Sequence, residues 1–83
     1  MQEQGTVELT DPQTGRLALR LADGSFVLAE QLGAEPLRPG QQLRGVFQSL
    51  GTEMLVDPRS DASHGVLIVA YGLSRAAIEE ELR

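Results

Sequence analysis

Several residue types are missing from this chain of 83 residues, and each absence narrows what it can do. It has no cysteine, which excludes disulfides, thiolate metal ligands and thiol nucleophiles. Small secreted domains usually depend on disulfides, so we expect a cytoplasmic protein. Lysine is absent too, and seven arginines against twelve acidic residues give an acidic chain of formal net charge −5. That balance disfavours a partner held mainly through phosphate contacts.

Aromatic residues and long apolar runs are also scarce. The chain has two phenylalanines, one tyrosine and no tryptophan, so few rings are available for stacking on a ligand. No apolar run approaches the length of a membrane span, and the N-terminus has neither the basic nor the apolar part of a signal peptide. We therefore expect no membrane partner and no leader peptide.

The clearest structural signal lies in residues 16–32, where apolar and other side chains alternate on both sides of Asp23-Gly24. Asp-Gly between alternating segments is typical of a β-hairpin with a two-residue turn. That turn fixes the register, which puts three pairs on a core face: Leu21 with Phe26, Leu19 with Leu28, and Leu17 with Glu30. The opposite face then holds two further pairs: Arg20 with Val27, and Ala18 with Ala29.

Three further segments, residues 5–10, 41–50 and 53–57, are also predicted strands. Gly45 within the second of these indicates a bulge or a tight bend. Five short strands with glycine-marked turns and one apolar face predict a small closed barrel. Its expected core is a single cluster: Val7, Leu9, Leu17, Leu19, Leu21, Phe26, Leu28, Phe47 and Val56.

The last third of the chain has a different character. Residues 58–65 form a polar loop, and residues 66–71 are apolar without alternation. Ser74 is suited to cap a helix over residues 75–82, with Leu73 and Ile78 placed to pack as a hydrophobic staple. We divide the chain into a barrel over residues 1–57 and a loop, strand and helix over residues 58–83 that pack on it, within one domain.

The N-terminal segments resemble a known family. Gly5-Thr6-Val7, residues 11–15 (DPQTG), 23–27 (DGSFV) and 37–43 (LRPGQQL) look like the layout of a cold-shock domain. Residues 4–7 and 21–29 are also similar to bacterial translation initiation factor one and S1-type domains. The resemblance covers residues 4–57. It implies a bacterial protein with an OB-fold, a five-stranded barrel that binds single-stranded nucleic acid on the face of its second and third strands. The expected class is all-β with a C-terminal helix, a five- to six-stranded OB-like barrel.

The chain departs from those families on the binding face. Six residues make up the possible ligand face: Arg16, Ala18, Arg20, Val27, Ala29 and Arg44. No ring among them can stack on a base, although such stacking contributes about 1–3 kcal/mol per base. Arginine side chains could still grip a phosphate or a carboxylate, but paired arginines on a solvent face are more often plain surface charge.

No group of residues has catalytic or metal-binding spacing. His64 shares a polar loop with Asp57, Ser60, Asp61 and Ser63, and the simplest interpretation is that it is solvated. A serine triad lacks its strained nucleophile turn. We therefore expect no enzyme, no metal and no cofactor.

Residues 66–71 admit two interpretations: a sixth strand buried between barrel and helix, or an interface with a second copy or another protein. The possible interface consists of Val66, Leu67, Ile68, Val69, Tyr71, Ile78 and Leu82. The sequence favours a non-catalytic OB-like module that mediates protein–protein interaction, as a homodimer or with a protein partner. The alternative is a weak or specialised single-stranded RNA- or DNA-binding protein of the cold-shock or S1 type.

Overall fold

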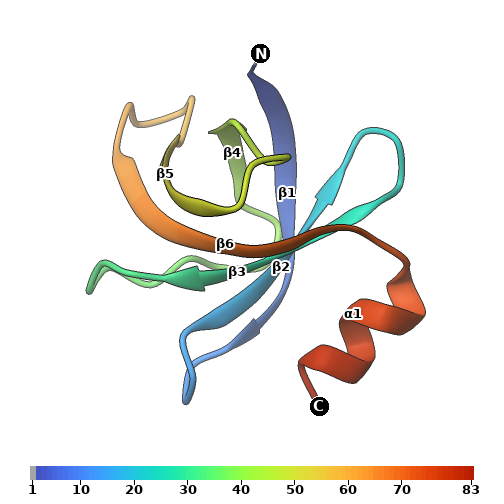
Figure 1. Ribbon diagram of the computed structural model, residues 1–83. Coiled ribbons are helices and arrows are strands. Elements are labelled where there is room, and N and C mark those ends of the chain that lie inside the picture. Colours follow the sequence, from blue (N-terminus) through green and yellow to red (C-terminus); the bar gives the residue numbers. More distant parts are fainter. Residues whose placement is uncertain (1) are drawn as a thin grey trace.

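Six antiparallel strands form a closed barrel, and a short helix follows them (Figure 1). The computed structural model describes residues 2–83. The elements are β1 (Glu3–Asp11), β2 (Arg16–Leu21), β3 (Phe26–Gln31), β4 (Gln42–Gly45), β5 (Gly51–Val56), β6 (Ser63–Leu73) and α1 (Arg75–Glu81). Around the barrel the order is β1-β2-β3-β6-β5-β4, and β4 pairs with β1 to close it. The predicted fold class is confirmed, and the architecture is consistent with an OB-like fold.

Strand β6 is part of the barrel wall and pairs with β3 on one side and β5 on the other. All neighbouring strands are antiparallel, which a closed barrel allows only when the number of strands is even. Figure 1 shows β6 running across the barrel toward α1. The expectation that five strands close the barrel without residues 66–71 is therefore wrong, because this segment supplies the sixth strand.

The register of the β2–β3 hairpin differs by one residue from the predicted one. Leu19 lies opposite Val27 and Ala18 opposite Leu28, because the loop has three residues instead of two. The amide of Gly24 donates to the carbonyl of Leu21 at 3.0 Å, and Gly24 has a φ of 87°. This is a tight turn followed by a left-handed residue, the usual build of a three-residue hairpin loop. A shift of one residue moves every β3 side chain to the other face of the sheet.

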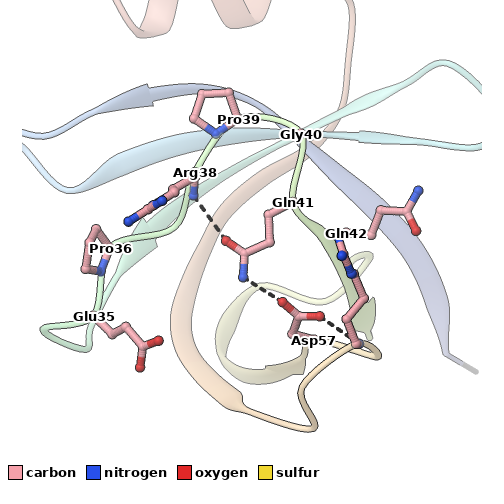
Figure 2. Close-up of a pocket in the computed structure, with 9 residues that line it drawn as sticks. Glu35, Pro36, Arg38, Pro39, Gly40, Gln41, Gln42 and Asp57 are labelled. Atoms are coloured by element: carbon pink, nitrogen blue, oxygen red, sulfur yellow. Dashed lines mark hydrogen bonds between the residues drawn. The ribbon is translucent and has the colours of Figure 1, made fainter.

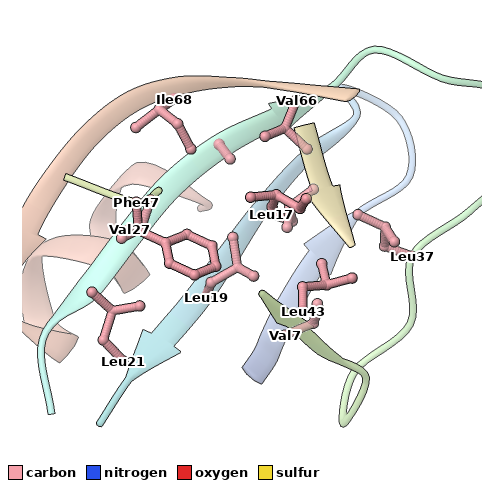
Figure 3. Packing of buried hydrophobic residues seen from close by; sticks show 12 residues of the cluster. Val7, Leu17, Leu19, Leu21, Val27, Leu37, Leu43, Phe47, Val66 and Ile68 are labelled. Carbon is pink, nitrogen blue, oxygen red and sulfur yellow. The ribbon is translucent and has the colours of Figure 1, made fainter. Parts of the chain in front are cut away.

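The barrel interior therefore contains the other half of β3. Twelve buried side chains form its core: Val7, Leu17, Leu19, Leu21, Val27, Ala29, Leu37, Leu43, Phe47, Leu55, Val66 and Ile68. The ring of Phe47, from the segment after β4, lies among these side chains (Figure 3). Leu37 joins them from the connector between β3 and β4. The inward positions of β6 are His64, Val66 and Ile68.

Phe26 and Leu28 form a second cluster outside the barrel, with Ala18 and with Ile78 of α1. Four partly buried residues surround it: Leu9, Ala70, Leu73 and Leu82. The register of β1 shifts between Val7 and Leu9, so that Leu9 joins this outer cluster while Val7 stays inside. The single core expected from the sequence is thus two cores, and half-buried Val56 belongs to neither.

Local contacts hold α1 against the barrel. The hydroxyl of Ser74 accepts a hydrogen bond from the amide of Ala77 at 3.1 Å, so the predicted N-cap is confirmed. Leu73 and Ile78 share the outer cluster, as a hydrophobic staple requires. The guanidinium of Arg75 lies 5.6 Å from the centre of the Phe26 ring. Within residues 2–83, α1 is too short to cross a membrane.

Candidate interaction surfaces

The predicted ligand face does not exist as one surface. Val27 and Ala29 point into the barrel, and Ala18 is buried beneath α1. This is a direct result of the hairpin register, which turns the β3 side chains the other way. Only the three arginines of that face, Arg16, Arg20 and Arg44, lie at outward positions.

Arg20 has a partner of its own. Its Nε lies 2.7 Å from Glu8 Oε1, and Nη1 of Arg75 lies 3.4 Å from the other oxygen of the same carboxylate. The hydrogen bond from Arg20 holds the pKa of Glu8 below its usual value, Arg75 acts in the same direction, and desolvation opposes both. Glu8 thus links β1 to β2 and to α1, and the guanidinium of Arg20 is already paired, although its side chain is 46% exposed.

The predicted protein interface is also divided. Val66 and Ile68 belong to the barrel core, and Ile78 of α1 is buried between the helix and the barrel wall. Among the remaining members, Tyr71 is 44% exposed and Val69 37% exposed, whereas Leu67 and Leu82 are half-buried. Alternation along β6 holds from His64 to Ile68, and a register shift against β3 beyond Ile68 then places Ala70 in the outer cluster. The exposed Val69 and Tyr71 lie on either side of Ala70.

A wide polar cleft of about 740 Å³ lies between the β3–β4 connector and the β5–β6 turn (Figure 2). Gln41 bridges its walls: its Oε1 accepts from the amide of Arg38 at 3.1 Å, and its Nε2 donates to Asp57 Oδ2 at 2.9 Å. The amide of Arg59 donates to the other Asp57 oxygen at 2.8 Å. This bond, followed by the one from Gln41, holds the pKa of Asp57 below its usual value. The network explains how the two loops are joined.

The prediction that His64 is solvated is wrong. It opens the inward row of β6, opposite Leu55, and is only 7% exposed. The loop residues near it in sequence do not surround it as ligands, and within residues 2–83 no three His, Asp or Glu side chains could hold a metal ion together.

Two exposed large apolar side chains lie close together on the outer wall of the barrel, and the sequence did not single them out. Leu32 and Met54 are 56% and 60% exposed. Gly65 of β6 lies between them, because its carbonyl accepts from the amide of Leu32 at 3.0 Å and its Cα is paired with Met54. Val46, which follows β4, lies in the same hollow. We call these four residues, Leu32, Gly65, Met54 and Val46, the apolar row.

A groove of about 470 Å³ follows the apolar row. Gly65 forms part of its floor, since a Cβ built there would lie 3.5 Å from the sulfur of Met54 and 3.9 Å from Cβ of Leu32. Both distances are ordinary van der Waals contacts, so an alanine would fit but would fill the depression between the two side chains. Glu53, Thr52 and Gln2 also line the groove.

The fold and these surfaces define a small β-barrel whose outer wall is partly covered by its own helix and partly bare. Comparison with protein-family models, with curated proteins and with solved structures finds none that matches the chain significantly.

Proposed function

We propose that this chain is a non-catalytic, OB-like binding module that binds another protein through the apolar row on the outer wall of β3, β6 and β5. The observation that carries the proposal is the exposure of Leu32 and Met54 on either side of Gly65. Large apolar side chains that lie together on a small protein are typical of interaction sites.

The other half of the outer wall supports the same conclusion. There, Phe26 and Leu28 are covered by α1 through Ile78, so the chain buries its outward apolar residues where its own segments reach them. No described residue covers Leu32 or Met54 in this way. A protein partner would cover the apolar row in the same way that α1 covers the outer cluster.

Nucleic-acid binding is the alternative, and the arginines are its basis. Within residues 2–83, Arg16, Arg38, Arg44 and Arg59 make no ion pair, and two of them line the polar cleft. Against this, Phe26 and Phe47 are buried, which leaves Tyr71 as the one exposed ring of the described chain. Without stacking groups, and with a net charge of −5, the protein-binding role has the stronger support.

The test is affinity purification of the tagged chain from native cells, with and without nuclease, using the unchanged protein, Met54→Glu and Leu50→Glu. Leu50 is a matched control because it is 64% exposed and does not line the groove. We expect a protein partner that survives nuclease treatment, is retained by Leu50→Glu and is lost from Met54→Glu. A partner lost on nuclease treatment, or one retained equally by both variants, would contradict the proposal.

A further inference from the structure

The C-terminal half of β6 has a neighbouring strand on one side only. Its pairing with β5 ends where Gly51 meets Ile68, whereas its pairing with β3 continues to Leu73. The hydrogen bonds of turns and loops within residues 2–83 do not reach residues 69–73 either. Figure 1 shows β6 continuing past β5 toward α1. We call residues 69–73 the free edge of β6, because one row of their backbone N–H and C=O groups faces no strand within the described chain.

Apolar side chains are exposed along the free edge. Val69 and Tyr71 are 37% and 44% exposed, and they flank Ala70, which packs against the outer cluster. Gly72 has a φ of 69°, so the chain turns after Tyr71 and the usable edge is only a few residues long. Register shifts against β3 also bend this stretch of β6, which restricts a partner strand to a short contact. The accessible part of the free edge is therefore centred on Ala70.

The free edge lacks the charges with which natural proteins guard such strands. Residues 65–74 contain no charged residue, and neither do residues 45–52, which lead into β5. Elsewhere the chain carries twelve acidic and seven basic residues. Charged residues or proline on an edge strand normally prevent its pairing with another chain. Their absence here leaves the free edge open to an added strand.

A second copy of this chain fits the free edge better than a different protein. Two such edges are self-complementary when they run antiparallel about a two-fold axis, since the N–H groups of each row then meet the C=O groups of the other. An axis through Ala70 places Tyr71 of each copy opposite Val69 of the other, and aromatic and β-branched residues form favourable cross-strand pairs. Two chains of net charge −5 repel each other, but at this uncharged edge they meet without opposing carboxylates.

We propose that the chain forms a homodimer in which the free edges of two β6 strands pair in antiparallel fashion around Ala70. The interface is small, so the dimer is weak and its population depends on concentration. The apolar row lies near the other end of β6, around Gly65, and stays open to the partner of the proposed function. The homodimer thus goes beyond that function and does not depend on it.

The experiment is analytical ultracentrifugation of the purified chain from about 1 μM to about 1 mM, a range that covers weak association. We expect the average mass to rise from 9.0 kDa toward twice that value. Tyr71→Lys and Val69→Lys should each weaken association about tenfold or more, because each places two like charges close to the axis. Both substitutions lower the net negative charge, so stronger general repulsion would not explain the loss. Leu32→Lys is the matched control, since it adds the same charge at an exposed apolar residue outside the free edge and should leave association unchanged.

Amide hydrogen exchange tests the pairing itself. Amides of residues 69–73 should exchange more slowly at the high concentration than at the low one, whereas those of the exposed turn at residues 58–61 should not change. Four results would each overturn the proposal: a monomer at every concentration, a dimer that both edge variants retain, a dimer that Leu32→Lys dissociates, or a dimer without added protection at residues 69–73. The purification with Met54→Glu judges the proposed function separately.

Discussion

Gly45 and Gly65 lie on neighbouring parts of the barrel wall, and the same substitution should have opposite effects at the two positions. A Cβ at Gly45 would lie 2.5 Å from Cδ2 of the buried Leu55 and 3.3 Å from the carbonyl oxygen of Met54. The first distance is far inside van der Waals contact, so Gly45→Ala forces the core to move. Overpacking of this kind costs about 1–3 kcal/mol.

At Gly65 the nearest atoms are 3.5 and 3.9 Å away and the backbone φ is not positive, so Gly65→Ala introduces no clash. An alanine in a strand interior also loses less backbone entropy on folding than glycine, which favours the folded state by roughly 0.5–1 kcal/mol. For a domain of this size 1 kcal/mol shifts the melting temperature by about 4–8 °C.

Thermal unfolding followed by circular dichroism should therefore give a Tm about 4–24 °C lower for Gly45→Ala and about 2–8 °C higher for Gly65→Ala. Urea titrations of both variants provide the control, because their slopes should equal that of the unchanged protein if only stability differs. Equal Tm changes at the two positions would refute the packing of β4 against β5 and the open floor of the groove.

Three further predictions follow from the fold and its charges. Leu19→Ala empties a fully buried position and should destabilise the domain by about 2–5 kcal/mol in urea unfolding, and a loss under about 1 kcal/mol would contradict the barrel core. The folded-state pKa values of Glu8, Asp23 and Asp57 are depressed, so their stabilising effect is present above about pH 4 and is lost as the pH falls further. The urea midpoint should be steady near neutral pH and fall below pH 4, with a shallower fall for Glu8→Gln; an unchanged slope in that variant would contradict the bridge to Arg20. Binding of mixed single-stranded RNA or DNA should be no tighter than about 10⁻⁴ M at physiological salt, and a salt-dependent micromolar affinity would revive the nucleic-acid alternative.

The sequence predicts the elements of this fold better than their register. Alternation around Asp23-Gly24 identifies the hairpin, and Ser74 marks the start of α1, because both signals are local. Whether the hairpin loop has two or three residues depends on one left-handed residue, and Gly24 suits both lengths. Because the two-residue loop was predicted, the faces of β3 were assigned the wrong way round, and the two cores were predicted as one.

The apolar row was harder to predict because its residues are distant in the chain. Leu32, Met54 and Gly65 meet only when β6 lies between β3 and β5, a pairing that no local pattern specifies. The alternation of β5 could have indicated that Met54 points outward. Because Met54 is paired with Gly65, no neighbouring side chain on β6 covers it. Residues 66–71 are uniformly apolar in sequence, yet only Val66 and Ile68 among them fill the barrel.

Backbone NMR of the isotope-labelled chain, titrated with the protein partner recovered by affinity purification, tests the central claim most directly. We predict that the largest amide shift changes fall on Leu32, Thr52, Met54 and Gly65, and that Gly65→Val abolishes them. Changes concentrated instead at the polar cleft, on residues 38–42 and 57–59, would show that the apolar row is not the binding site.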